Sequence, residues 1–463
     1  MLISDIPDLE DILDTIVPHN EPCFTEEEAL DIYDTCIHLM EEYIDSHPTI
    51  ISEPDFHDIF YDDIEEIIMS HFEDDIFLDE DELQNIIDNA FDDFFEDYMP
   101  PRSFDDTFII NEPNHTIIDK KITYLKSKPQ PIQRSKEWYD FRQNLITASN
   151  AYKAFENQSS RNQLIYEKCQ PLPQNINVTK LDENGEIISQ TIEDPNTIKM
   201  VNINTTLHWG QKYEPLSVMI YEYKYNTKID DFGCIKHDTY SFLGASPDGI
   251  NVDKTSSRYG RMLEIKNIVN REIDGIPKKE YWIQMQLQME VCNLDECDFL
   301  ETQFVEYDSY NDYISDTNDS KMKGLIMYFH TKEGKPHYEY RPLHINSEED
   351  SEKWEKEQMD KHNNLSWIRN YYWKLEQYSC VLVLRNRLWF QKNIHYLENL
   401  WEIVLKERET GYEHRAPNKR IKKENESVPT FKGLLINICK QTSSSTRDKP
   451  CIIEKLDLDL NSV

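Results

Sequence analysis

The fold is decided by two short stretches, GASPDGI from Gly244 to Ile250 and RMLEIKN from Arg261 to Asn267. In an extended strand successive side chains point to opposite faces, so Glu264 and Lys266 share one face and their apolar neighbours take the other. Asp248 stands in a turn at a strand end, where its carboxylate is expected to meet Glu264 across neighbouring strands. The pattern predicts two converging carboxylates beside a lysine.

Such a group of side chains has a specific chemistry. Two carboxylates repel each other unless a cation joins them, and hard oxygen ligands with open positions suit Mg²⁺, with Mn²⁺ as a substitute. A lysine two residues beyond a ligand can orient the attacking water, so the set suits metal-assisted phosphodiester hydrolysis. Taken alone, each fragment is more often structural, because Asp-Gly usually marks a hairpin turn and Glu-x-Lys a solvated strand face.

Further motifs, found in a fixed order along the chain, favour a functional role for these fragments over a structural one. The motifs, in chain order, are QRSKEWYDFR from Gln133 with ITAS from Ile146, WGQKYE from Trp209, ASPDG from Ala245, LEIK from Leu263 and YWIQMQ from Tyr281. In this order they resemble the lambda-exonuclease/YqaJ-type viral recombinase nucleases of the PD-(D/E)XK superfamily. The resemblance spans about residues 133–306, and giant DNA viruses encode nucleases of this kind.

The resemblance implies a role for each residue of the central motifs. Asp248 and Glu264 bind the metal, the backbone carbonyl of Ile265 is a further ligand, and Lys266 positions the water. Glu214 matches an upstream acidic residue that supports a metal or its water shell, although a surface glutamate is the plain alternative.

Three further residues are implied by the outer motifs. Gln284 matches a glutamine at the edge of the active site, although a polar residue on an amphipathic helix is a plausible alternative. Arg142 and Ser149 match positions that hold phosphate near the DNA end, since a guanidinium and a hydroxyl at a helix start suit a phosphate. Outside the motif, Arg142 reads as a helix-surface arginine.

The charge of the chain is unevenly distributed. The whole chain has 49 Lys+Arg against 88 Asp+Glu, a formal net charge of −39, which taken as an average argues against nucleic acid. Residues 1–100 hold 33 of the acidic residues and no Lys or Arg, so the remainder has 49 basic and 55 acidic residues, a net of −6. A local basic groove is therefore compatible with the rest of the chain.

The acidic segment has helical periodicity between prolines. Thr25 with Glu26-Glu27-Glu28 predicts a helix start, and apolar residues from Leu30 to Ile44 recur at three and four residues. Three roles are open: a solvated helical domain, a mimic of DNA charge that restrains the nuclease, or a docking surface for a basic partner. His57 and His71 are expected to be surface histidines rather than cation ligands.

The expected fold class is α/β: a restriction-endonuclease-like core with a central mixed β-sheet flanked by helices, an acidic all-α N-terminal domain and a helical C-terminal region. The expected domains are residues 1–120, residues 121–345 with a hairpin insertion at 170–204 turning at Asn184-Gly185, and residues 346–463 with a basic tail. Residues Lys126–Pro131 look like a linker.

Composition also bears on compartment and cofactors. No apolar run reaches the roughly 18 residues that a membrane span needs, and the N-terminus lacks the basic region of a signal peptide. Cys380, Cys439 and Cys451 are too dispersed for the four-cysteine iron–sulfur pattern of the related Cas4-type nucleases, so no cluster is expected. An intracellular protein is expected, located in the host cytoplasm or viral factory, with the virion and the nucleus as alternatives.

These observations predict a Mg²⁺-dependent deoxyribonuclease. The resemblance implies 5′-to-3′ digestion of double-stranded DNA ends in recombination, repair or defence. A helicase or single-strand annealing protein is a candidate partner, and a homo-oligomer is a candidate assembly. The alternatives are an endonuclease or nickase of the same fold, or a catalytically silent DNA- or partner-binding protein.

Overall fold

A computed structural model describes most of the chain. The described residues are 22–72, 78–108, 114–133, 135–172, 177–181, 187–191, 202–203, 205–317, 322–332 and 334–417. The predictions for Asn184-Gly185 and for the end of the basic tail lie outside these residues. Between 177 and 191 the expected hairpin is present as two antiparallel strands, β3 (Asn177–Leu181) and β4 (Ile187–Thr191).

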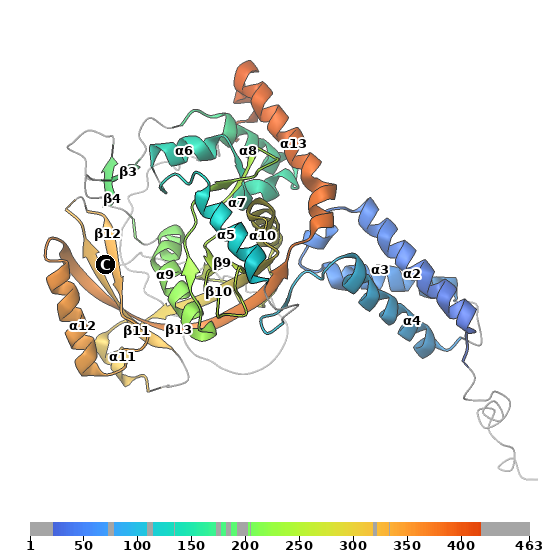
Figure 1. Ribbon diagram of the computed structural model, residues 1–463, viewed down its shortest axis with the longest axis horizontal. Coiled ribbons are helices and arrows are strands. Elements are labelled where there is room, and N and C mark those ends of the chain that lie inside the picture. Colours follow the sequence, from blue (N-terminus) through green and yellow to red (C-terminus); the bar gives the residue numbers. More distant parts are fainter. Residues whose placement is uncertain are drawn as a thin grey trace, which may run out of the picture. The chain divides into compact units, whose positions relative to one another are not determined.

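The centre of the fold is an eight-stranded sheet (Figure 1). Its strand order is β12-β11-β13-β10-β9-β8-β5, and β1 also pairs with β13. Only β9 and β10 run parallel among the described pairs of this sheet, and the others are antiparallel. The bounds are β1 Phe104–Asp105, β5 Ile229–Asp230, β8 Gly249–Asn251, β9 Met262–Ile268, β10 Glu296–Glu306, β11 Lys323–His330, β12 Pro336–Tyr340 and β13 Ser366–Leu384. The predicted mixed sheet is confirmed.

Two long helices cover opposite faces of the strands that carry the central motif. Leu263 and Ile265 of β9 pack in one apolar cluster with Tyr221 of α9 (Thr206–Tyr225). The other face of β9 turns Glu264 toward α10 (Lys279–Cys292), which lies beside the sheet in Figure 1. The predicted alternation of β9 is therefore confirmed, and it aims the polar residues at α10.

A smaller sheet of order β2-β7-β6 and several short helices adjoin α10. In it β2 (Ile146–Thr147) pairs parallel with β7 (Leu243–Ala245), which brings the ITAS motif next to the chain that enters Asp248. The remaining bounds are β6 Ile235–Lys236, α5 His115–Ser127, α6 Lys136–Gln143, α7 Ala148–Ala151, α8 Gln158–Cys169 and α11 Tyr310–Ser315.

The acidic segment is helical, as predicted. Its helices are α2 (Glu26–Ser46), α3 (Phe56–His71) and α4 (Glu80–Asp93). Thr25 caps α2 in a reciprocal capping box with Glu28, which satisfies backbone donors that the first turn leaves free. Met40 and Ile44 are buried, but Leu30 is 58% exposed, so the expected apolar stripe covers only the later turns of α2.

The prediction of a helical C-terminal region is wrong for Ser366–Leu384. Helices α12 (Glu348–Lys361) and α13 (Arg387–Thr410) are present, but between them β13 runs for 19 residues through the sheet. This segment is rich in aromatic and β-branched residues, which favour a pleated, half-buried surface. Tyr371 and Trp373, two residues apart, are both buried, which is the spacing of one strand face.

The helical and sheet regions share an apolar core. One cluster of buried residues contains Phe60 and Met99 together with Trp282 of α10. The Trp282 indole N–H donates to the Arg102 carbonyl (2.9 Å), and the Asn393 amide of α13 donates to the Pro48 carbonyl (2.7 Å).

The predicted linker at 126–131 is wrong at its start, since residues 126–127 belong to α5.

His57 is half-buried where the helical region meets Arg102, and not a surface histidine as expected. Its Nε2 accepts the backbone N–H of Arg102 (3.0 Å), so the ring is neutral at that atom. Burial, and then the charge of Arg102, lower the pKa of His57. His71, by contrast, is exposed.

Stability of the chain is expected to fall as pH drops from about 6.5, the ordinary value for histidine, through the lower pKa that His57 has in the folded protein. Above about 6.5 the contribution is complete, because His57 is then neutral in both states. The slope is at most about 1.4 kcal/mol per pH unit for one proton. Thermal unfolding across this window should show a shallower pH dependence for His57→Gln, while His71→Gln should match wild type. Equal slopes in both variants would contradict this role.

Candidate active site

Asp248 lies at the point where the chain leaves the small sheet and enters the large one. It follows β7 and immediately precedes Gly249, the first residue of β8. A Cβ on Gly249 would lie 2.1 Å from Ile229 Cγ2 of β5, so only glycine fits against that neighbour. The Asp-Gly pair therefore marks a close strand contact, and not the hairpin turn that such a pair usually forms.

The Asp248 carboxylate reaches across to the next strand. Its Oδ2 accepts the backbone N–H of Ile265 (2.7 Å) beyond the end of β8. Burial raises the pKa of Asp248, and the negative charges of Glu264 and Glu214 raise it further, while Lys266 and the Ile265 N–H oppose the shift. Uncompensated negative charge is therefore concentrated around Asp248.

Glu264 is held by three side chains. It is 1% exposed. Its Oε1 accepts the ammonium of Lys266 and the amide of Gln284 (2.7 Å), and its Oε2 accepts the amide of Gln288 (2.7 Å). A carboxylate offers about four lone-pair sites, so about one remains free, on Oε2. Asp248, Glu264, Lys266 and Gln284 are thus brought together, as the sequence predicted.

Lys266 is the cation of this group. Burial alone would lower its pKa, but the charges of Glu264 and Asp248, with the hydrogen bond to Glu264, raise the pKa above its ordinary value. Its Nζ also lies 4.7 Å from the ring centre of Tyr281, the first residue of the YWIQMQ motif. Lys266 therefore stays charged at neutral pH and is fixed beside the carboxylates.

The donor set fits a hard divalent cation. Asp248 and Glu264 supply oxygen ligands. The single positive charge of Lys266 does not balance the negative charges of these two carboxylates and Glu214. In a strand the N–H and C=O of one residue point to the same side. Since the Ile265 N–H points to Asp248, its carbonyl faces the same region, so Asp248, Glu264 and Ile265 would hold such an ion.

Glu214 is on α9 and its side chain is exposed. Its charge acts on Asp248 and also on Tyr340 of β12. Glu214 is therefore not a buried ligand, although it lies close enough for its charge to raise the pKa of Asp248.

Arg142 and Ser149 lie on short helices on either side of β2, with α6 before the strand and α7 after it. The guanidinium of Arg142, at the end of α6, lies 4.6 Å from the ring centre of Trp138. Ser149 of α7 is exposed, with its hydroxyl 3.4 Å from that of Thr147. Within the described residues no hydrogen bond joins either side chain to Asp248 or Glu264, so their role stays a prediction.

Gln288 is a site residue that the motifs do not single out. It lies one turn beyond Gln284 on α10 and is fully buried. Its amide donates to Glu264 Oε2 and also to the Ser246 carbonyl (3.3 Å), so it links both arms of the site. The sequence signal for this role is the spacing of four residues from Gln284, which places both glutamines on the same face of a helix. Gln286, between them, instead bonds the Leu384 carbonyl and the Asn386 N–H.

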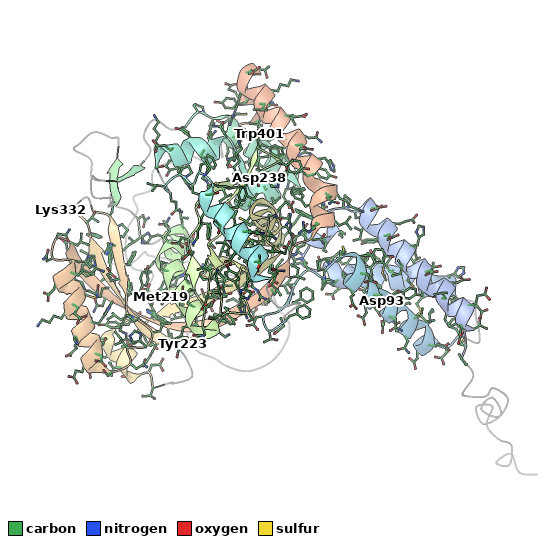
Figure 2. All side chains as sticks on the ribbon, in the orientation of Figure 1. Asp93, Met219, Tyr223, Asp238, Lys332 and Trp401 are labelled. Atoms are coloured by element: carbon green, nitrogen blue, oxygen red, sulfur yellow. The ribbon has the colours of Figure 1, made fainter. Side chains whose placement is uncertain are left out.

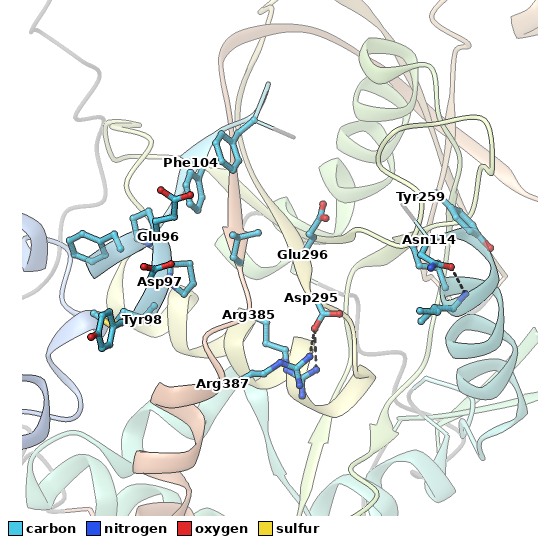
Figure 3. A pocket seen from close by; sticks show the side chains of 18 of the residues that line it. Glu96, Asp97, Tyr98, Phe104, Asn114, Tyr259, Asp295, Glu296, Arg385 and Arg387 are labelled. Carbon is cyan, nitrogen blue, oxygen red and sulfur yellow. Dashed lines mark hydrogen bonds and ion pairs between the residues drawn. The ribbon is translucent and has the colours of Figure 1, made fainter. Parts of the chain in front are cut away.

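A large cavity lies away from these residues. It measures about 1040 Å³, and its lining includes Phe104, Tyr259 and the cluster of Asp295 with Arg385 and Arg387 (Figure 3). None of the predicted site residues lines it. The carboxylate site is therefore identified by its charges and hydrogen bonds rather than by cavity size.

Comparisons with known proteins agree with the predicted resemblance. Residues 137–295 match the model of the YqaJ-like viral recombinase domain, a range that contains every predicted site residue. An uncharacterized protein, R354, of Acanthamoeba polyphaga mimivirus is 30% identical over 336 residues, which are 64% of this chain and 57% of that protein. This chain thus spans just over half the length of that giant-virus relative.

Two solved structures are also similar. The alkaline exonuclease LHK-Exo from Laribacter hongkongensis gives a TM-score of 0.32 at 20% identity, covering 60% of this chain and 95% of that chain. The same exonuclease in complex with dAMP gives a TM-score of 0.29 at 18% identity, with the same coverage.

Proposed function

We propose that this chain, whose residues 137–295 match the YqaJ-like viral recombinase domain, is a divalent-metal-dependent DNA nuclease. The observation that carries the proposal is the convergence of Asp248, Glu264 and Lys266 within the matched range. The favoured activity is 5′-to-3′ digestion of duplex DNA ends, with Mg²⁺ as the ion and Mn²⁺ as a substitute. Its product would be single strands for recombination, repair or defence.

The chain's own residues divide the work. Asp248 and Glu264 hold the ion, and the amides of Gln284 and Gln288 keep the Glu264 carboxylate in one orientation. Lys266, charged and tied to Glu264 Oε1, lies where it can orient the attacking water and stabilise negative charge that develops on the phosphate. Arg142 and Ser149 are the proposed phosphate contacts near the DNA end.

A bound divalent cation supplies Lewis-acid stabilisation of the phosphodiester and lowers the pKa of water. In-line attack on phosphorus would break the bond to the 3′ oxygen and leave a 5′-phosphate and a 3′-hydroxyl. Asp248, with its raised pKa, must be ionised to hold the cation.

Substrate form tests the proposal. Linear and circular duplexes of the same sequence are incubated with the protein and Mg²⁺, and linear duplexes with phosphorothioate linkages at either the 5′ or the 3′ ends report polarity. The proposal expects loss of linear DNA only, blocked by 5′ phosphorothioates. Nicking of circles would indicate an endonuclease of the same fold, and binding without hydrolysis a silent DNA-binding protein.

Gln288→Met is expected to lower the hydrolysis rate by about 10–100-fold, the usual effect of losing a partner that orients a metal ligand. Methionine has a similar shape but cannot donate to Glu264 Oε2 or the Ser246 carbonyl. The Mg²⁺ concentration for half-maximal rate should therefore rise, as measured by single-turnover cleavage across a Mg²⁺ series.

Gln286→Met is the matched control on the same helix. It removes a buried glutamine of equal size whose bonds go to Leu384 and Asn386, so it should alter stability but not the Mg²⁺ dependence. The positioning role of Gln288 fails if both variants show the same Mg²⁺ curve.

The remaining assignments are proposals of wider scope. DNA is the proposed partner, a helicase or annealing protein and self-association are further candidates, and an intracellular location fits these roles. The three-domain division at residues 120 and 345 is retained as a proposal, with β13 contributing to the nuclease sheet. Among the described residues, none of the helices has the length and apolar character needed to cross a membrane.

A further inference from the structure

A second group of side chains that can bind a metal lies at β12, the edge strand of the large sheet on the side away from β8. His337 and Glu339 are two residues apart on β12, the edge strand, and so share one face. His362, the residue that ends α12, meets them from the helix. One ligand atom from each of the three side chains lies within 4.8 Å of the others.

The three side chains are positioned by well-defined elements. β12 pairs with β11, and the loop between them contains Lys332 (Figure 2). Buried Phe329 of β11 lies opposite His337 in register, and its ring centre is 5.4 Å from that of His362 and 6.3 Å from that of His337. This apolar floor limits the movement of both imidazoles. The side chains of His362 and Glu339 are only 13% and 21% exposed.

The hydrogen bonding at Glu339 is overcrowded. Its Oε1 is approached by His337 Nε2 (3.4 Å), by His362 Nε2 and by Lys361 Nζ (2.9 Å). One carboxylate oxygen has about two lone-pair sites, so three donors cannot all be satisfied there. A metal ion between the carboxylate and the lone pairs of two neutral imidazoles removes this conflict, and Lys361, which is 60% exposed, is free to turn to solvent.

We propose that His337, Glu339 and His362 bind a zinc-class transition metal ion, with water as the fourth ligand. Two imidazoles and one carboxylate form a set that Zn²⁺ accepts, whereas Mg²⁺ and Ca²⁺ prefer oxygen alone. Ligands about 2.0–2.1 Å from a tetrahedral ion stand roughly 3.3 Å apart, close to the 3.4 Å between His337 and Glu339.

This site is separate from the carboxylates of Asp248 and Glu264. Because of its position, a bound ion would stabilise the fold rather than take part in hydrolysis. The ion joins the edge strand of the sheet to the end of α12. An edge strand exposes unpaired backbone groups, so fixing β12 to a helix protects that edge. The proposal does not depend on the nuclease activity proposed above.

The test is a zinc titration of the full-length chain, stripped with chelator and kept in excess Mg²⁺ to occupy oxygen-only sites. Calorimetry should detect one equivalent of Zn²⁺ at the site, and Co²⁺ should give the visible absorption of a tetrahedral nitrogen–oxygen site. Zinc should also raise the midpoint of thermal unfolding, because the ion binds only the folded chain.

His337→Ala and His362→Ala are each expected to weaken zinc affinity by at least about 10–100-fold and to abolish the cobalt spectrum. His337 is 38% exposed, so its removal should leave the fold intact, which circular dichroism checks. His344→Ala is the control, since His344 is exposed and lies outside the cluster. The proposal is overturned if wild type binds no zinc, or if the His337→Ala and His362→Ala variants bind it as tightly as wild type.

Discussion

Asp248→Asn is expected to lower the rate of DNA hydrolysis about a thousandfold or more. A divalent cation contributes several kcal/mol of charge stabilisation to phosphoryl transfer, and about 4 kcal/mol corresponds to about a thousandfold in rate. Asparagine keeps the shape of the side chain and can still accept the Ile265 N–H, but it lacks the charge that holds the ion. Single-turnover cleavage of linear duplex with Mg²⁺ measures the loss.

Two further measurements separate catalysis from folding. Without metal, the midpoint of thermal unfolding should be unchanged or higher, because burial and the charge of Glu264 already disfavour an ionised Asp248. DNA affinity should be unchanged or tighter, since one negative charge is removed. Asp231→Asn, on an exposed residue just after β5, should behave as wild type. A variant at Asp248 that cleaves at the wild-type rate would remove this residue from the site.

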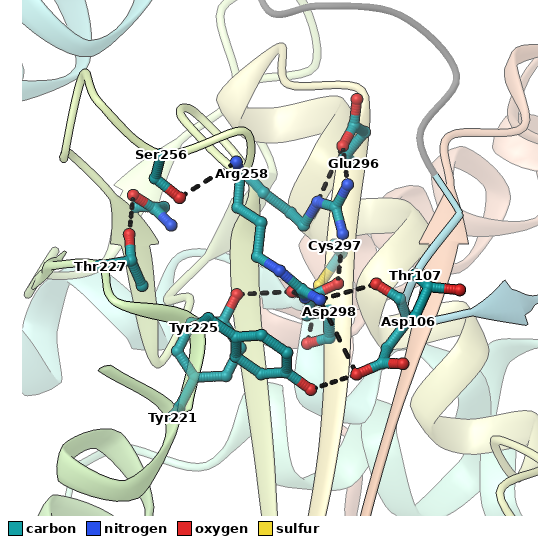
Figure 4. Close-up of polar contacts among 12 residues, drawn as sticks. Asp106, Thr107, Tyr221, Tyr225, Thr227, Ser256, Arg258, Glu296, Cys297 and Asp298 are labelled. Carbon is teal, nitrogen blue, oxygen red and sulfur yellow. Dashed lines mark hydrogen bonds and ion pairs between the residues drawn. The ribbon is translucent and has the colours of Figure 1, made fainter. Parts of the chain in front are cut away.

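The largest expected effect on stability is at Asp298, in the centre of the sheet. Its carboxylate on β10 is fully buried and accepts hydrogen bonds from Arg258, Tyr221 and Arg261, the last at 3.0 Å (Figure 4). Arg258 and Arg261 are 8% and 3% exposed, and Asp298 is the fully buried carboxylate that they share. Arg261 also pairs with Glu296 (2.8 Å), and Arg258 lies 3.8 Å from the Asp106 carboxylate. Asp298→Asn should lower the free energy of unfolding by about 3–5 kcal/mol, because Glu296 and Asp106 at the edge of the group only partly balance two buried guanidinium charges once the central carboxylate is lost.

Denaturant unfolding of wild type and variant measures this difference. Asp295→Asn is the control: its side chain is 51% exposed and pairs with Lys121, Arg385 and Arg387, so a loss below about 1 kcal/mol is expected. If both variants lose the same free energy of unfolding, burial of the ion pairs around Asp298 does not determine how much they stabilise the fold.

The site was predictable wherever its residues are close in sequence. Alternation along β9 places Glu264 and Lys266 on one face, and the order of the motifs selects Asp248 and Gln284. Gln288 was missed because a third glutamine on one helix resembles an ordinary amphipathic pattern, and only the fold shows which face meets Glu264.

Features that depend on distant contacts were not predictable. The aromatic run within Ser366–Leu384 fits either a helix or a strand by composition, and its pairing with β10 and β11 decides for a strand. His57 looked exposed because Arg102, its partner, is 45 residues away. His337 and His362 are likewise brought together by distant packing: Trp354 of α12 lies in one apolar cluster with Phe329 of β11, the strand that pairs with β12.

The position of β13 has a consequence for how the chain folds during synthesis. Among the described residues it is the last strand along the chain, yet it lies between β10 and β11 and also pairs with β1. While the ribosome is still making residue 365, β10 has an unpaired edge and β11 lacks its neighbour on that side. Such edges are prone to aggregation, and pairing between distant segments is slow. The sheet that carries Glu264 is therefore completed only after residue 384 has emerged, so in a shorter nascent chain the sheet beneath the candidate site is unfinished.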